Sequence, residues 1–376
     1  MRSLPWLTGL LPVVTLLLAL PHCSSAQLVQ PTPLPDSGVE PGADAQGPDP
    51  SDPDAGPIDP SDPDAGPIPD GPIPRTSDVT VQVMPSDKGQ AIIDSIKGAK
   101  TSVHATLYLL TGSSFEQAFI DAKKAGRDVK VVLNKNFPDG SNGNTDAFDK
   151  LKAAGVNVAW APSVYTFTHA KSIIIDAKKA WIMTMNLTFT SPTENREFLV
   201  QDNDATDVAD LEKVFDADFN NKSLLINTKL VLSPANATAV DARKRLIQLV
   251  ASAKSTIEME AEGFGETQLT DAIIAAHARG VAVKIVLESS QASTTGEAAA
   301  IAKLKDNKVP VVGVTKPYIH AKTIVVDGAL AYVGSQNFTF TALVQNREIG
   351  VIFDAAAEVA KVRNTIVADY GNGKAL

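Results

Sequence analysis

The chain contains one block of sequence twice, and this internal repeat restricts its possible folds more than any other feature. The first copy, "FTHAKSIIIDAKKAWIMTMNLTF", runs from Phe167 to Phe189, and the second, "YIHAKTIVVDGALAYVGSQNFTF", runs from Tyr318 to Phe340. Polar residues in and just after the block recur at a constant offset of 151 residues. The recurring pairs are His169 and His320, Lys171 and Lys322, Asp176 and Asp327, Asn186 and Asn337, and Glu197 and Glu348. Two like halves predict a pseudo-two-fold arrangement within one chain.

Both halves alternate apolar runs with amphipathic stretches, which indicates an α/β layered fold. In the first half we expect helices at 89–100, 115–125, 147–154 and 206–219, and strands at 101–110, 128–135, 156–162, 180–186 and 196–202. In the second half we expect helices at 241–254, 269–279, 297–305 and the end of the chain, and strands at 255–264, 281–289, 309–314, 330–337 and 347–354. The apolar run of each repeated block adds one more strand to its half.

The N-terminal region differs from the rest in composition. Residues 1–26 resemble an export signal, with Arg2 ahead of the apolar run Trp6–Leu20. Two processing sites remain open: cleavage before Gln27, or a lipobox in which Cys23 becomes the lipid attachment site. Residues 27–78 are rich in Pro and Asp, contain "DPSDPDAGPI" twice, and predict a disordered tether. We place the two repeated halves at 79–228 and 229–376.

The distribution of charge bears on the class of ligand. The chain carries a formal charge of −9, and residues 1–78, with two basic and eleven acidic side chains, account for all of it. The remaining residues are formally neutral, whereas proteins that wrap a long polyanion usually show a basic surplus. The spacing of Asp and Glu does not indicate a metal site, and we expect neither metal nor cofactor.

The repeated His and Lys indicate an anion-binding site. Side chains two apart in a strand share a face, so each His lies beside a Lys, and neighbouring cations are costly to bury unless an anion contacts both. Phosphate fits this requirement, with Lys171 and Lys322 supplying charge. Further neutral donors are expected from Asn186, Asn337 and Ser335. By the same alternation, Asp176 and Asp327 point to the opposite face, where structural hydrogen bonds are expected.

Two histidines around one phosphate suggest how a phosphodiester could be cleaved. One neutral imidazole attacks phosphorus while the other protonates the leaving oxygen. The attacking ring needs its far nitrogen held as a donor, and a carboxylate is the usual partner. Glu197 and Glu348, each in the sequence "NRE", are the candidates.

The segment "HAKTIVVDGALAYVGSQN" matches the HxKxxxxDxxxxxxGSxN signature of the phospholipase D superfamily, and "HAKSIIIDAKKAWIMTMN" resembles it except that Met183 and Thr184 replace Gly and Ser. The likeness covers roughly residues 80–376. It implies two similar halves, each a mixed sheet flanked by helices, related by a pseudo-two-fold axis with one active site. It also implies metal-independent catalysis through a phosphohistidine, with His169 as nucleophile and His320 as acid.

These observations predict an exported phosphodiesterase that hydrolyses or transfers phospholipid head groups. We expect a monomer with an internal pseudo-dimer, at a membrane surface as a periplasmic or outer-membrane lipoprotein, or otherwise secreted. Two alternatives remain open. One is an endonuclease of the same superfamily, favoured by halves too short for a lipid-specific lid. The other is an inactive surface protein that binds anionic lipid.

The lipobox interpretation is testable through Cys23. Cys23→Ser should release the protein from the membrane fraction, because the substitution removes the thiol to which lipid would be attached. Fractionation and immunoblotting of cells that express the full chain measure this. Unchanged export and attachment would show that the lipobox interpretation is wrong.

Overall fold

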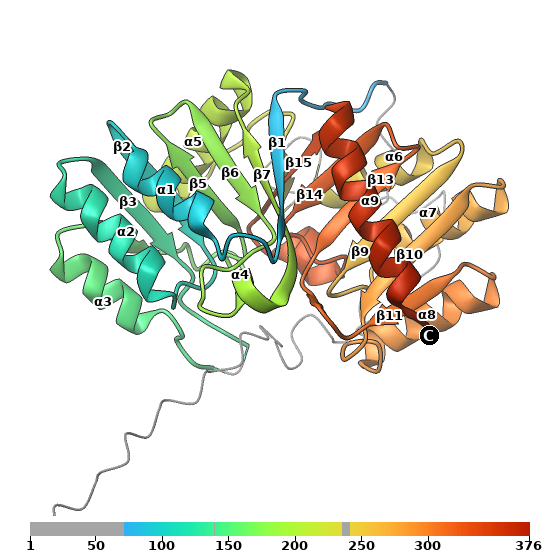
Figure 1. Cartoon of the computed structure of the whole chain (residues 1–376). Coiled ribbons are helices and arrows are strands. Elements are labelled where there is room, and N and C mark those ends of the chain that lie inside the picture. The colour runs from blue at the N-terminus through green and yellow to red at the C-terminus, as the bar shows by residue number, and fades with distance from the viewer. Residues whose placement is uncertain (1–70, 139, 235–240) are drawn as a thin grey trace, which may run out of the picture. The chain divides into compact units, whose positions relative to one another are not determined.

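A computed structural model describes residues 71–376 of the chain, apart from 139 and 235–240 (Figure 1). The expected export signal, Cys23 and most of the expected tether therefore lie outside the described residues. Within the part of the chain that is described, no helix is both long and apolar enough to cross a bilayer.

The elements follow the order expected from the repeat. The first half contains β1 (Val79–Met84), α1 (Gln90–Gly98), β2 (Ser102–Leu107), α2 (Ser113–Lys124), β3 (Asp128–Leu133), α3 (Thr145–Ala153), β4 (Asn157–Trp160), β5 (Lys171–Ile175), β6 (Lys179–Met183), α4 (Ser191–Glu194), β7 (Asn195–Asp202) and α5 (Ala205–Phe219). The second half contains β8 (Val231–Ser233), α6 (Ala242–Ala251), β9 (Thr256–Ala261), α7 (Thr267–Ala278), β10 (Ala282–Glu288), α8 (Thr295–Asp306), β11 (Val311–Val314), β12 (Tyr318–Ile319), β13 (Lys322–Val326), β14 (Leu330–Gly334), the π-helical turn η2 (Thr341–Gln345), β15 (Glu348–Phe353), α9 (Ala356–Asn372) and β16 (Lys374–Ala375).

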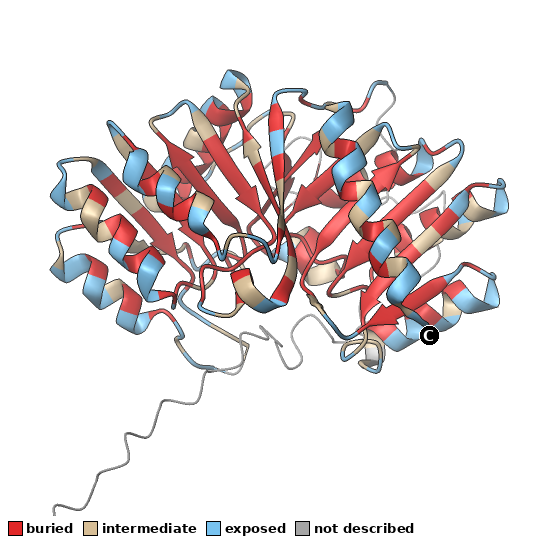
Figure 2. Cartoon of the chain, viewed as in Figure 1, coloured by how far each residue is buried: buried red, intermediate tan, exposed pale blue. Residues whose placement is uncertain are grey.

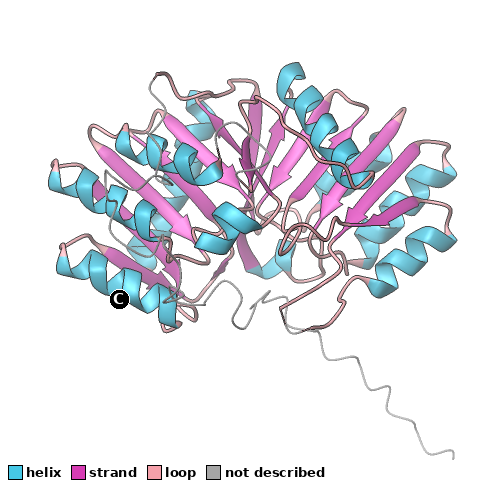
Figure 3. Cartoon of the chain, turned by 180° about the vertical axis from the view of Figure 1, so that it is seen from behind, coloured by secondary structure: helices cyan, strands magenta, loops and turns pink. Residues whose placement is uncertain are grey.

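Each half has its own mixed sheet, which confirms the predicted fold class. The first sheet has the order β1-β7-β6-β5-β2-β3-β4, and the second has the order β16-β11-β10-β9-β13-β14-β15-β8. The strands β2, β3 and β4 are parallel, as are β9, β10 and β11. The repeated blocks form the antiparallel strands β5 and β6 in one half and β13 and β14 in the other. Helices connect the parallel strands (Figure 3).

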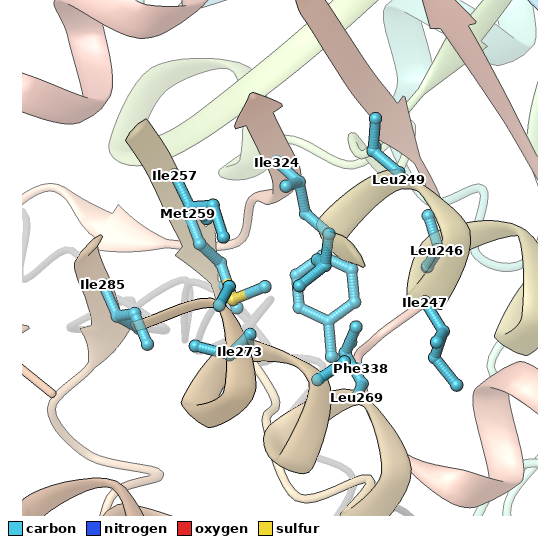
Figure 4. Packing of buried hydrophobic residues seen from close by; sticks show 14 of the residues in the cluster. Leu246, Ile247, Leu249, Ile257, Met259, Leu269, Ile273, Ile285, Ile324 and Phe338 are labelled. Carbon is cyan, nitrogen blue, oxygen red and sulfur yellow. The ribbon is translucent and has the colours of Figure 1, made fainter. Parts of the chain in front are cut away.

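The two sheets share an inner core, and each also has an outer core of its own. The outer face of the first sheet packs against α1, α2 and α3, and that of the second packs against α6, α7 and α8 (Figures 1 and 4). The inner faces of both sheets join α5 and α9 in a single apolar cluster, which includes Ile174 and Val200 from the first half and Val325 and Val351 from the second. Most strand residues are buried, whereas the outer helices expose one face (Figure 2). Burial of apolar surface thus fixes the halves against each other.

The last residues of the expected tether are ordered, so the prediction of disorder for 27–78 is wrong from residue 71 onward. Ile73 is 7% exposed and belongs to the core of the second half. Thr76 pairs with Phe353 of β15, and Arg75 forms an ion pair with Asp354 at 2.7 Å. The polar composition of the whole segment gave no sign that Ile73 is buried or that Thr76 pairs with β15 of the sheet.

The repeated aspartates have structural roles, but the alternation argument used to place them was wrong. Asp176 follows the end of β5 in a turn, with φ of 57°, and Asp327 follows β13 in the same way with φ of 56°. The carboxylate of Asp176 accepts the backbone N–H groups of Lys100, Thr101 and Ser102. Burial opposes ionisation, but these donors together outweigh it and lower the pKa of Asp176 to about 2. Each aspartate therefore fixes the loop that leads from a helix into the central strand.

This arrangement predicts acid-sensitive stability. Asp176→Asn should lower the free energy of unfolding by roughly 1–3 kcal/mol at pH 7, because an amide cannot accept from all three backbone donors as a carboxylate does. The depressed pKa means that the wild-type contribution is present above about pH 4 and is lost as the pH falls toward 2. Urea unfolding at pH 7 and pH 3 measures both effects. Equal stability of the variant and the wild type at pH 7 would contradict this role.

Candidate active site

Each motif histidine enters the opposite half of the molecule. The strand β12, just before His320, pairs in parallel with Asn195 and Arg196 of β7. Reciprocally, Thr168, just before His169, bridges to Arg347, the residue that precedes β15. The backbone N–H of His169 donates to Arg347 O at 2.9 Å, and that of His320 donates to Arg196 O at 3.2 Å. The two halves thus exchange the short segments that carry their histidines.

This exchange crosses the two histidine–glutamate pairs. His169 Nδ1 lies 2.9 Å from Oε1 of Glu348, and His320 Nδ1 lies 2.9 Å from Oε1 of Glu197. Both imidazoles and both carboxylates are at most 3% exposed. A carboxylate at Nδ1 holds that nitrogen as the donor and leaves Nε2 as the nitrogen able to react. Sequence reasoning selected the correct residue types, but the repeat did not indicate that each glutamate serves the histidine of the other half.

Both glutamates are held by hydroxyl and amide donors. Ser335 Oγ donates to Glu348, and Thr184 Oγ1 donates to Glu197. Ser335, which was expected to contact phosphate, donates its hydroxyl to this carboxylate and accepts from the N–H of Ile349. Thr184, which replaces the signature Ser, makes the corresponding pair of contacts with Glu197 and the N–H of Phe198. The departure from the motif thus preserves the hydroxyl.

The two motif lysines share one contact and differ in another. Lys171 Nζ donates to the carbonyl of His169 at 2.7 Å, and Lys322 Nζ donates to that of His320 at 3.1 Å. Neither histidine lies within a regular strand, since β5 and β13 begin at the lysines. Beyond these bonds, Lys171 Nζ lies 4.9 Å from the ring centre of Tyr108, whereas Lys322 Nζ lies 2.6 Å from Glu262 Oε2.

Both motif asparagines are buried. Asn186 is 1% exposed, and within the described residues neither of its side-chain polar atoms has a hydrogen-bond partner. Buried amides usually have partners, so an amide in this state is suited to receive a polar ligand. Asn337 is also buried, and it lies close to Gly263, where an added Cβ would come within 3.3 Å of the Asn337 side chain.

The electrostatics of the centre favour retention of a proton. Burial raises the pKa of Glu348 to about 8, although Lys171, Ser335 and Asn346 act in the opposite direction. Glu348 Oε1 and His169 Nδ1, 2.9 Å apart, are close enough to share one proton in a hydrogen bond. An imidazole whose Nδ1 is so occupied presents Nε2 for nucleophilic attack.

Two arginines support the exchanged segments from behind. Arg347 is 1% exposed and its Nε lies 2.9 Å from Asp218 on α5. Arg196 Nε lies 2.6 Å from Asp369 on α9. Because each arginine directly precedes a site glutamate, these pairs tie the position of each carboxylate to a core helix. They also repeat at the offset of 151 residues.

Several site residues escaped sequence reasoning. Tyr108 follows Leu107, which pairs with Lys171, and Glu262 follows Ala261, which pairs with Lys322. The two residues therefore occupy equivalent positions, one aromatic and the other charged. A signal existed, since Tyr108 and Glu262 lie at equivalent places near the ends of the expected strands 101–110 and 255–264. It was missed because the comparison of the halves was restricted to positions where they agree.

Comparison with known proteins identifies a family. The family model described as "Cardiolipin synthase, PLD-like domain" matches residues 92–219 and 246–369. The chain is similar to a phospholipase D of Rickettsia typhi, with 33% identity over 112 residues, which is 30% of this chain and 54% of that protein. It is also similar to a cardiolipin synthase of Clostridium perfringens, with 24% identity over 313 residues, which is 70% of this chain and 64% of that protein.

A solved structure shares the two-half fold. The phosphatidylserine synthase of Haemophilus influenzae superposes with a TM-score of 0.61 at 13% identity, covering 80% of this chain and 88% of the other. This likeness concerns the fold. The chain spans about half the length of the first curated relatives it matches, two rickettsial phospholipases D and a zebrafish mitochondrial cardiolipin hydrolase.

Substitution of Thr184 tests whether its hydroxyl stabilises the buried carboxylate of Glu197. Thr184→Val should lower the free energy of unfolding by roughly 2–3 kcal/mol, because it leaves Glu197 and the N–H of Phe198 without their buried partner. Thr184→Ser keeps the hydroxyl and loses one methyl group, so it should cost about 1 kcal/mol. Urea unfolding of both variants measures the difference. Equal losses would show that packing, and not the hydroxyl, explains the position.

Proposed function

The chain belongs to the phospholipase D-like family, and from this premise we propose that it is an exported, metal-independent phosphodiesterase that hydrolyses or transfers phospholipid head groups. The observation that carries the proposal is the crossed pair of imidazoles, each with a buried carboxylate at Nδ1. That arrangement supplies two reactive Nε2 atoms beside two lysines, which are the groups that phosphodiester cleavage requires.

The proposed reaction has two steps. In the first, Nε2 of His169 attacks phosphorus, the bond from phosphorus to the leaving oxygen breaks, and Nε2–H of His320 gives its proton to that oxygen. In the second, His320 takes a proton from water or an alcohol, whose oxygen attacks phosphorus and breaks the bond to His169. Water gives a phosphomonoester, and an alcohol gives a new diester.

The assignment of roles rests on the surroundings of the two rings. His320 lies between two carboxylates, with Glu197 at Nδ1 and Glu262 Oε2 3.4 Å from Nε2. The carboxylate near Nε2 of His320 has no counterpart beside His169, where residue 108 is a tyrosine. His169 lies edge-on to Tyr108, with ring centres 4.5 Å apart, and has Glu348 at Nδ1. These surroundings suit His169 to attack and His320 to donate.

A phospholipid substrate is favoured over nucleic acid by charge and by one surface residue. The halves carry no basic surplus. Phe189, three residues beyond Asn186, is 78% exposed and not part of the core, whereas Phe338 is fully buried. An exposed aromatic ring close in sequence to the site fits contact with acyl chains. The apolar segment Trp6–Leu20 supports export.

Alanine substitutions of the two histidines should affect the two reaction steps differently. His169→Ala and His320→Ala should each lower kcat/KM for a phospholipid by roughly 10³-fold, within the range of lost acid–base or nucleophilic catalysis. With a nitrophenyl phosphodiester, whose leaving group needs no proton, His320→Ala should still form a phosphorylated protein, whereas His169→Ala should not. Mass spectrometry after acid-free quenching detects the adduct. An adduct on His169→Ala alone would reverse the roles.

The substrate class is tested separately with the wild-type protein. Phosphatidylcholine with ethanol, plasmid DNA and a nitrophenyl phosphodiester are each supplied with and without a chelator. Formation of phosphatidylethanol that persists in chelator supports the proposal. Nicking of DNA without lipid turnover would identify a nuclease, and tight lipid binding without turnover of any substrate would identify an inactive lipid-binding protein.

A further inference from the structure

A carboxylate of the protein itself occupies the second half of the site. Glu262 directly follows β9 and is 5% exposed. Its Oε2 lies 2.6 Å from Lys322 Nζ and 3.4 Å from His320 Nε2, and its Oε1 accepts from the Tyr318 hydroxyl at 3.0 Å. Three groups therefore hold one carboxylate, and two of them are groups that the proposed mechanism assigns to substrate phosphate.

This carboxylate remains ionised while it is held. Burial opposes its charge, but His320, Lys322 and His169 lower the pKa of Glu262 to about 2. The ammonium group of Lys322 is thereby partly neutralised before any substrate binds. In the first half the equivalent position holds Tyr108, whose uncharged ring faces Lys171. The two halves therefore present unequal charge to a ligand.

The region behind Glu262 adds to this asymmetry. Burial and the neighbouring carboxyls Glu262 and Glu288 raise the pKa of Glu297 to about 8, although the N–H of Phe264 acts in the opposite direction. Glu288 accepts from the N–H of Ile319, next to His320. At the first-half position equivalent to Glu262, residue 108 is a tyrosine and carries no carboxyl. A ligand oxygen that approaches Lys322 must therefore approach Glu262, whose Oε2 lies 2.6 Å from Lys322 Nζ.

We propose that Glu262 is a specificity-determining residue that makes the site accept singly charged phosphodiesters and disfavour doubly charged phosphomonoesters. The inference rests on the proposed function, since hydrolysis of a diester leaves a monoester. One negative charge can be met by Lys171 and the buried amide of Asn186 in the first half. A second charge would lie against the carboxylate of Glu262. Like charges in contact weaken binding, so the monoester product would leave readily.

Two small probes isolate the charge. At pH 8 dimethyl phosphate carries one negative charge and methyl phosphate carries nearly two, since its second ionisation lies near pH 6. Binding of each to the full chain is measured by isothermal titration calorimetry or by line broadening of its phosphorus resonance. The wild-type protein should bind dimethyl phosphate more tightly than methyl phosphate. Tighter binding of methyl phosphate to the wild type would overturn the proposal without any variant.

The variant Glu262→Gln should reverse that preference. It keeps the size of the side chain and removes the charge, so methyl phosphate should bind roughly tenfold more tightly while dimethyl phosphate changes by less than about threefold. Adding Lys322→Gln to Glu262→Gln should abolish the gain. Asp271→Asn is the matched control, because Asp271 forms an ion pair with Lys303 and removal of its charge leaves the site unchanged. A control with the same gain, or no gain in Glu262→Gln, would overturn the proposal.

These measurements need no turnover, so they separate this inference from the proposed function. If the protein shows the expected charge preference but cleaves no phosphodiester, the proposed role of Glu262 stands and the proposed enzymatic function is wrong. If the protein cleaves phospholipid but methyl phosphate binds equally to the wild type and to Glu262→Gln, the proposed enzymatic function stands and the proposed role of Glu262 is wrong.

Discussion

The structure depends on a reciprocal exchange between its halves. Each half supplies a histidine on a segment that hydrogen-bonds to the other half, and each supplies the buried glutamate that holds the other's imidazole. The ion pairs of Arg196 and Arg347 with the core helices keep both glutamates in place. A shift of one sheet relative to the other would separate both pairs at once. The large inner core common to the two sheets is therefore also the support of the site.

Much of this fold could be predicted because it is local. Period-two apolar runs and amphipathic stretches marked the main strands and helices of both halves, within a few residues of their observed ends. Very short elements carry too few residues for a period, which explains why α4, β8, β12 and β16 were missed. The six-residue strand β1, just after the expected tether, was missed as well. Ordering of residues 71–78 depends on Ile73 entering a distant core, and composition averaged over the tether does not reveal a single contact of this kind.

The site was predictable in its residue types and not in its pairing. Identical spacing in the two halves located the histidines, lysines and glutamates. Whether a glutamate bonds to the histidine of its own half or of the other half depends on how the two sheets pack together. The spacing of residues in the sequence carries no information about that packing. Ser335 was expected to contact phosphate as a neutral donor, and the spacing did not indicate that its hydroxyl donates to the carboxylate of Glu348. Glu262 was overlooked because it marks a difference between the halves.

The crossed pairing has a consequence for the history of such a chain. A single copy would lack the carboxylate that its own imidazole requires, so it could act only as a symmetric homodimer in which both copies change together. Covalent fusion removes that restriction. Once the copies are separately encoded, a tyrosine can persist at position 108 while an acidic residue occupies position 262. Tandem duplication thereby allows the two halves of the site to differ, and a reaction centre inherited with symmetry can acquire polarity.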